Sequence, residues 1–108
     1  MALIDRGDVF DADLPDVEPH PVVVVSRQTT LPFRSTVTVV LVTSVVRGHG
    51  AEVALGPGEG LDHDCVANCD EIHTIRKERL TRRRGSLGFE RTAALEAALR
   101  LSLGLDRK

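Results

Sequence analysis

Two long runs of β-branched residues dominate the hydrophobic pattern of the chain. The first, PVVVVS, covers residues 21–26, and the second, STVTVVLVTSVV, covers residues 35–46. Uninterrupted valines are typical of a central strand that is buried on both faces. Proline is acceptable at the first position of such a strand. In the second run, the alternation of a strand predicts that four side chains share one face: Val37, Val39, Leu41 and Thr43.

Weaker alternating segments flank these two runs. We expect four further strands, at residues 8–13, 51–55, 65–75 and 82–87. The strand at 65–75 is expected to fray into a loop, and the strand at 82–87 to form a sheet edge. Clusters of proline or glycine predict the connections, at 14–21, 47–50 and 56–60.

The periodicity becomes helical over residues 88–103. The residues that recur at helical spacing are Leu95, Ala98, Leu99 and Ser102, with Leu103 extending the apolar face. Gly104 is a suitable C-terminal stop. Strands followed by one terminal helix predict an α+β fold with a largely antiparallel sheet or small barrel. The length of 108 residues predicts a single domain, residues 1–108.

Charge is unevenly distributed, although the formal net charge is only −2. Residues 1–19 carry six acids against one arginine, and residues 76–84 carry six cations against one acid. We therefore expect two unlike surfaces, of which the basic one is able to bind anions. The alternative is that the basic segment is an ordinary solvated loop and strand edge.

Composition excludes several classes of protein. The chain has no Trp, no Tyr and three Phe, which rules out nucleic-acid recognition on a platform of stacked aromatic side chains. No apolar run is long enough for a membrane span, and the N-terminus does not resemble a secretory leader. Two cysteines are too few for a disulfide framework and suit a reducing cytoplasm.

A metal site is the first chemistry to consider. Four residues of metal-ligand type alternate on one face of the strand expected at 65–75 and the turn before it: His63, Cys65, Cys69 and His73. In a strand, however, Cys65 and Cys69 lie roughly 13 Å apart, too far to share one zinc ion. We expect buried thiols and surface imidazoles, with neither metal nor cofactor. The glycines near residue 58 match neither a P-loop nor a dinucleotide fingerprint.

Polar residues gather where the two valine-rich strands begin and end. His20 directly precedes the first strand, and Thr43, Ser44 and Arg47 close the second. Asn68 and Asp70 follow further along the chain. These side chains are candidates for a functional site, although Thr43 and Ser44 could equally satisfy local backbone groups.

Read in order, the segments resemble the MazF/PemK family of toxins. The resemblance rests on RGDVFDADL, HPVVVVS, TVTVVLVTS, EVAL, GLDHDCVANCDEIHTIRKERL and the terminal helix ending LRLSLGL. It spans roughly residues 6–105, and the order and spacing of the segments are its most specific features. It implies a small, strongly curved antiparallel sheet with a C-terminal helix, similar to that of the gyrase poison CcdB.

The resemblance also implies an activity. Members of this family are sequence-specific, metal-independent endoribonucleases that act on single-stranded RNA as cytoplasmic homodimers, each inhibited by a MazE-like antitoxin. The ribose 2′-hydroxyl is the nucleophile, and the products are a 2′,3′-cyclic phosphate and a 5′-hydroxyl. The alternative is a binding module with the same fold, either a gyrase-directed poison or a co-repressor that only binds its antitoxin.

The family's catalytic pair is an arginine before the second strand and a threonine at the end of the third. Thr43 matches, whereas His20 occupies the arginine position. Histidine differs from arginine because it can accept and donate a proton near neutral pH. The loop at 14–19 is also shorter than is usual in the family. We predict six RNA-binding residues: Arg27, Ser44, Arg47, Asn68, Asp70 and Arg76.

Overall fold

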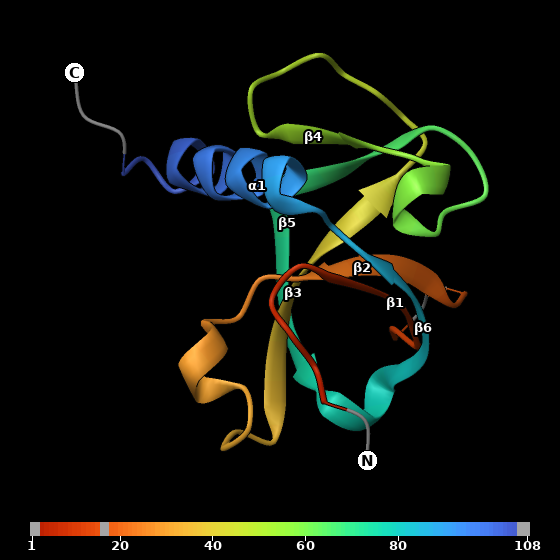
Figure 1. The fold of residues 1–108 in the computed structure, drawn as a ribbon, viewed down its shortest axis with the longest axis vertical. Helices are drawn as coiled ribbons and strands as arrows, with labels where there is room; N and C mark the ends of the chain where they lie inside the picture. Colours follow the sequence, from red (N-terminus) through yellow and green to blue (C-terminus); the bar gives the residue numbers. More distant parts are fainter. Residues whose placement is uncertain (1–2, 16–17, 106–108) are drawn as a thin grey trace.

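A computed structural model describes residues 3–15 and 18–105 of the chain. Within these residues, six strands form one sheet and one α-helix follows them (Figure 1). The strands are β1 (Asp8–Ala12), β2 (His20–Val24), β3 (Thr36–Thr43), β4 (Glu52–Leu55), β5 (Cys65–Arg76) and β6 (Leu80–Ser86). The helix is α1 (Phe89–Ser102), and short 3-10 helices are η1 (Gln28–Thr30), η2 (Pro57–Glu59) and η3 (Lys77–Arg79).

The sheet has the strand order β4-β5-β3-β2-β1-β6, and each neighbouring pair is antiparallel. The predicted antiparallel sheet with a C-terminal helix is therefore confirmed. The sheet is open, with β4 and β6 as its two edges, so the barrel alternative is not realised. The edge position predicted for the strand at 82–87 is also confirmed.

Two strand predictions need correction. The second valine-rich run forms a strand only as far as Thr43, and Val45 and Val46 beyond it are exposed, because the backbone turns away from the sheet there. The strand at 65–75 does not fray: β5 is 12 residues long and reaches Arg76. Its register against β3 shifts between Ile72 and Asn68. Strand β5 pairs with β3 on both sides of this shift, and its residues 65–68 also pair with β4.

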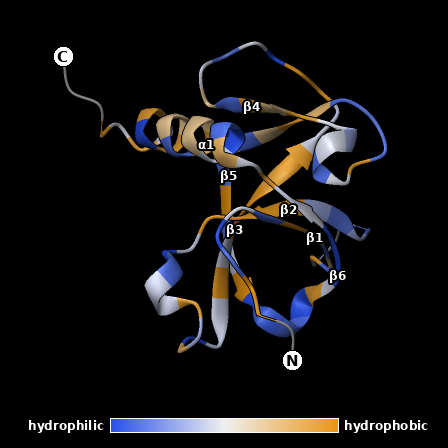
Figure 2. Ribbon diagram, viewed as in Figure 1, coloured by the Kyte–Doolittle hydropathy of each residue, from blue (hydrophilic) through white to orange (hydrophobic). Residues whose placement is uncertain are grey.

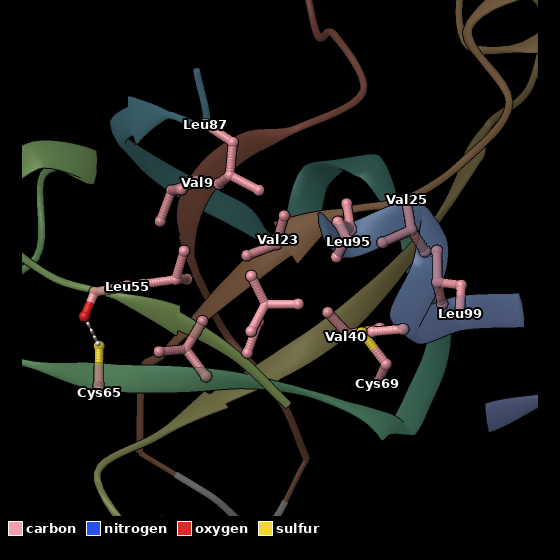
Figure 3. Close-up of a cluster of buried hydrophobic side chains, with 14 of the residues drawn as sticks. Val9, Val23, Val25, Val40, Leu55, Cys65, Cys69, Leu87, Leu95 and Leu99 are labelled. Atoms are coloured by element: carbon pink, nitrogen blue, oxygen red, sulfur yellow. Dashed lines mark hydrogen bonds between the residues drawn. The ribbon is translucent and has the colours of Figure 1, made fainter. Parts of the chain in front are cut away.

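The sheet is buried on both faces at β2 and β3, as the uninterrupted valines predict. Figure 2 shows the hydrophobic residues of these strands in orange. On one face, Val23 and Val40 pack in the cluster that includes Leu95 and Leu99 of α1 (Figure 3). On the other face, the alternate valines of both strands pack in a second cluster with Phe10, Leu14 and Leu31. Helix α1 lies beside β4 and β5 (Figure 1).

Helix α1 ends as the sequence predicts, with one difference. Leu95, Ala98 and Leu99 are buried, and Gly104 adopts a left-handed φ of 69° beyond the last turn. Leu103, expected to extend the apolar face, is instead 57% exposed because the helix ends at Ser102 and the chain leaves the core.

The acidic and basic segments are neighbours and do not form two unlike surfaces. Strand β1 carries acids of the N-terminal segment and pairs with β6, which carries arginines of the basic segment. The resulting ion pairs are Asp8 with Arg83 at 3.2 Å, Asp11 with Arg84 at 3.1 Å and Asp13 with Arg79 at 4.0 Å. The expectation of separate surfaces is therefore wrong, because strands far apart in sequence pair in the sheet. Asp16, counted among the acids, lies outside the described residues.

Candidate functional site

His20 and Thr43 lie at the same end of the two central strands. His20 is the first residue of β2 and Thr43 the last of β3, and the register Val22 to Leu41 runs antiparallel between them. The imidazole Nε2 of His20 lies 2.5 Å from the carbonyl oxygen of Val42. Sequence reasoning expected His20 in the preceding loop, whereas it pairs with Ala12 as part of the sheet.

This end of the sheet borders two cavities that share His20 and Thr43. The first has a volume of about 230 Å³, and we call it the His63 cavity. Besides the two shared residues, its lining includes Ser44, Asp62, His63 and Arg84. The second has a volume of about 430 Å³, and we call it the Arg47 cavity. Its lining includes Arg47, Asn68 and Glu71.

The hydrogen bonds that His20 and Thr43 make within the protein determine which donor or acceptor atom each side chain can present to a ligand. A carbonyl oxygen only accepts, so the bond to Val42 places the proton of neutral His20 on Nε2 and leaves a lone pair on Nδ1. The hydroxyl of Thr43 accepts a hydrogen bond from the backbone N–H of Val45 at 3.1 Å. Its own hydrogen is therefore available for an oxygen acceptor. The pair thus offers one proton acceptor and one hydrogen-bond donor.

Glu52 fixes the turn that carries Arg47. Its carboxylate accepts hydrogen bonds from the backbone N–H groups of Arg47, at 2.9 Å, and Gly48, at 2.8 Å. The bond from Arg47 is the main cause of the lowered pKa of Glu52, because it stabilises the charged carboxylate. Sequence reasoning missed Glu52, since a single acid in a strand has no distinctive pattern.

His63 and Arg84 are also site residues that sequence reasoning did not assign. The sequence suggests His63 only as a metal ligand and Arg84 only as part of the basic segment. Arg84 is 12% exposed and donates hydrogen bonds to the carbonyl of Gly60 at 3.1 Å, to Asp62 at 3.0 Å and to Asp11 at 3.1 Å. No local sequence signal could have placed these residues beside His20, because strand pairing and loop docking bring them together.

The structure brings only some of the predicted RNA-binding residues to the site. Ser44 lines the His63 cavity, and Arg47 and Asn68 line the Arg47 cavity. Three residues lie elsewhere. Asp70 accepts a hydrogen bond from Ser102 of α1, Arg76 pairs with Glu78, and Arg27 lines a different hollow with Arg34.

The two thiols lie in the core. Cys65 and Cys69 are both buried and unbonded to each other, and burial raises the pKa of Cys69 to about 11. Within residues 3–15 and 18–105, no group of three or more His, Cys, Asp or Glu side chains is arranged to hold a metal ion. Over the same residues, no helix has the length and apolarity needed to cross a membrane.

Comparisons with known proteins identify relatives of the whole described fold. A family model described as PemK-like, MazF-like toxin of type II toxin-antitoxin system matches residues 5–103. The probable endoribonuclease MazF5 of Mycobacterium tuberculosis is 30% identical over 107 residues, which cover 98% of this chain and 98% of that protein.

Solved structures give the same result. The Mycobacterium tuberculosis toxin MazF-mt6 superposes with a TM-score of 0.85 at 31% identity, over 93% of this chain and 99% of that one. A mycobacterial endoribonuclease in complex with its cognate antitoxin superposes with a TM-score of 0.86 at 28% identity, over 97% and 99%.

The open antiparallel sheet, the terminal helix and the polar site at the ends of two central strands define a class of small toxins with a single sheet. The protein belongs, within that class, to the PemK-like, MazF-like toxin family of type II toxin–antitoxin systems.

Proposed function

We propose that the protein is the toxin of a type II toxin–antitoxin pair and acts as a sequence-specific endoribonuclease on single-stranded RNA. The observation that carries the proposal is the meeting of His20 and Thr43 at one strand end, where both border the His63 and Arg47 cavities. The names of its relatives favour an endoribonuclease over a gyrase-directed poison or a co-repressor.

The chemistry is transphosphorylation within the RNA strand. Nδ1 of His20 accepts the proton of a ribose 2′-hydroxyl, whose oxygen attacks the adjacent phosphorus. The hydroxyl of Thr43 donates to a non-bridging phosphate oxygen, and Arg47 supplies positive charge as the phosphorane forms. The bond from phosphorus to the 5′-oxygen breaks and that oxygen gains a proton, which leaves a 2′,3′-cyclic phosphate and a 5′-hydroxyl.

Ser44 and Asn68 are suited to contact nucleotides beside the scissile phosphate, since each lines one of the two cavities. Arg27, Asp70 and Arg76 lie away from both cavities. If these three side chains contact a bound RNA, they contact nucleotides further from the scissile phosphate.

The protein works in the cytoplasm as a homodimer that a MazE-like antitoxin inhibits. A neighbouring fold that was solved with its cognate antitoxin supports the partner assignment. Size-exclusion chromatography with light scattering tests the dimer, because a dimer has twice the 11.7 kDa mass of the chain.

The activity is tested with purified protein, a mixed RNA substrate and EDTA between pH 5 and 8. Primer extension and end analysis report cleavage, recognition sequence and end chemistry together. Thr43→Ala removes a donor to the developing charge, and we expect a loss of about 100-fold or more. His20→Ala removes the proton acceptor, and we expect a loss of about 100-fold or more as well.

Thr81→Ala is the matched control, because Thr81 is exposed on β6, lines neither cavity and donates its hydroxyl hydrogen to the carbonyl of Asp11. It should cleave at the wild-type rate. Intact RNA after incubation with the wild-type protein, at every pH tested, would contradict the proposed activity.

A further inference from the structure

A second histidine shares a cavity with His20. His63 lies in the loop between η2 and β5 and lines the His63 cavity together with His20 and Thr43. The other two histidines lie elsewhere: His49 contacts Glu52 and Asp70, and His73 lies beside Glu71 on β5. The fold thus brings together two imidazoles that are far apart in sequence.

The loop that carries His63 is held firmly against β6. Arg84 binds the carbonyl of Gly60 and the carboxylate of Asp62, directly before His63. Gly60 has a left-handed φ of 89°, and its α-carbon lies so close to the Arg84 backbone that a side chain would collide with it. On the other side of His63, Cys65 begins β5. His63 is therefore positioned between Asp62, which Arg84 holds, and Cys65, the first residue of β5.

The ring nitrogens of His63 are not used in other interactions with the residues that the structure describes. Within residues 3–15 and 18–105, the ring has no hydrogen-bond or ion-pair partner, and it is exposed to the cavity and solvent. Both ring nitrogens are therefore available to a bound substrate, and imidazole is a side chain that can both accept and donate a proton. His20 differs, because its Nε2 is committed to the Val42 carbonyl.

Transphosphorylation requires two proton transfers, and His20 accounts for one. The 2′-hydroxyl must lose a proton, and the 5′-oxygen must gain one as its bond to phosphorus breaks. Thr43 serves poorly for the second transfer, because a hydroxyl gives up its proton too reluctantly. Arg47 serves no better, because a guanidinium stays protonated throughout.

We propose that His63 is the general acid of this toxin and that His20 and His63 form a two-histidine acid–base pair; this assignment rests on the proposed ribonuclease function. His20 Nδ1 takes the proton from the 2′-hydroxyl, and the new bond from O2′ to phosphorus forms. Protonated His63 gives its proton to the 5′-oxygen as the P–O5′ bond breaks. Solvent then removes the proton from His20 and returns one to His63.

The test uses His63→Gln, which keeps polarity and size but cannot transfer a proton. On ordinary RNA we expect its cleavage rate to fall about 100-fold. His73→Gln is the matched control, since His73 is exposed and lies outside both cavities.

A second substrate separates proton donation from a structural role. In an RNA whose scissile 5′-oxygen is replaced by sulfur, the leaving group departs without protonation. We expect His63→Gln to cleave this substrate within about threefold of the wild-type rate, whereas His20→Gln stays slow on both substrates. Thermal unfolding of each variant confirms that it is folded.

The outcomes are distinct. If the wild-type protein cleaves RNA and His63→Gln does so equally well, the assignment of His63 is overturned and the proposed function stands. If His63→Gln is slow on both substrates, His63 is not the proton donor and the assignment is also overturned. If the wild-type protein cleaves neither substrate, the proposed function fails and the assignment fails with it.

Discussion

A histidine at position 20 can do what an arginine at the same position cannot. The hydrogen bond from Nε2 to the Val42 carbonyl leaves one nitrogen, Nδ1, as a proton acceptor. A guanidinium there would offer charge and donors but no acceptor. Under the proposed function, histidine at this position moves proton transfer onto His20 and requires positive charge from another residue. Arg47 is the cation that lines the Arg47 cavity with His20 and Thr43.

Glu52 makes the stability of the protein depend on pH. Its folded pKa is below the ordinary value of 4.5, so its contribution to stability is present above that value and is lost as the pH falls through the folded pKa. We expect Glu52→Gln to lower the free energy of unfolding at pH 7. The difference from the wild type should shrink steadily below about pH 4.5.

Urea denaturation between pH 3 and 8 measures this difference. Glu18→Gln is the control, because Glu18 is exposed and forms no hydrogen bond or ion pair with the other residues that the structure describes. A Glu52→Gln deficit that stays constant down to pH 3 would show that the carboxylate charge does not hold the turn.

At the scale of elements, the pairing of β1 with β6 does more than extend the sheet. It brings the first and last strands together, so that Asp11 and Arg84 meet at 3.1 Å with both side chains largely buried. Arg84 then binds the loop at Gly60 and Asp62. One side chain thus connects β1, β6 and the loop that carries His63.

Removal of Arg84 should therefore destabilise the fold. In Arg84→Ala, Asp11 keeps its charge in a largely buried position without its partner, and we expect a loss of about 2 to 4 kcal/mol in the free energy of unfolding. Arg76→Ala is the control, since Arg76 pairs with Glu78 in an exposed position and should change little. Equal unfolding midpoints for the two variants in urea would contradict the structural role of Arg84.

The elements that the sequence predicts well are those with an uninterrupted local pattern. The valines of β2 and β3 and the helical spacing of Leu95 and Leu99 each indicate one type of structure, and the fold confirms them. Strand β5 does not fray as the sequence suggests, because it is held by its partner strands β3 and β4, which its own sequence does not reveal. The family resemblance pairs His20 with Thr43. It does not indicate His63, whose place depends on the docking of a loop.

For the whole molecule, the small net charge of −2 arises because an acidic segment and a basic segment nearly cancel each other. Three arginines of the basic segment, Arg79, Arg83 and Arg84, form ion pairs with acids of β1 and its flank, which reduces the charge that this segment offers to RNA. Two cations lie beside His20 and Thr43: Arg47 lines one cavity, and Arg84, which lines the other, is paired with Asp11 and Asp62. We therefore expect RNA recognition to depend on a few contacts at the strand ends.

This arrangement predicts a shallow salt dependence of RNA binding. Each phosphate neutralised on a single strand contributes about −0.7 to the slope of log affinity against log salt concentration. We expect a slope near −1 per protomer, against about −4 if all six cations of residues 76–84 contacted phosphates. The slope is measured by fluorescence anisotropy with a non-cleavable, 2′-deoxy-substituted RNA, between about 50 and 300 mM salt. A slope steeper than about −3 would contradict the view that ion pairs with nearby acids keep the basic segment from binding RNA phosphates.

The burial of both cysteines makes the native protein a convenient background for spectroscopic labelling. Cys65 and Cys69 are shielded in the core, and the raised pKa of Cys69 keeps its thiol protonated at neutral pH. A cysteine introduced on the exposed face of α1 would therefore react with a maleimide dye well before either natural thiol. Fluorophores attached in this way could report the arrival of an antitoxin or an RNA without any prior removal of cysteines from the core.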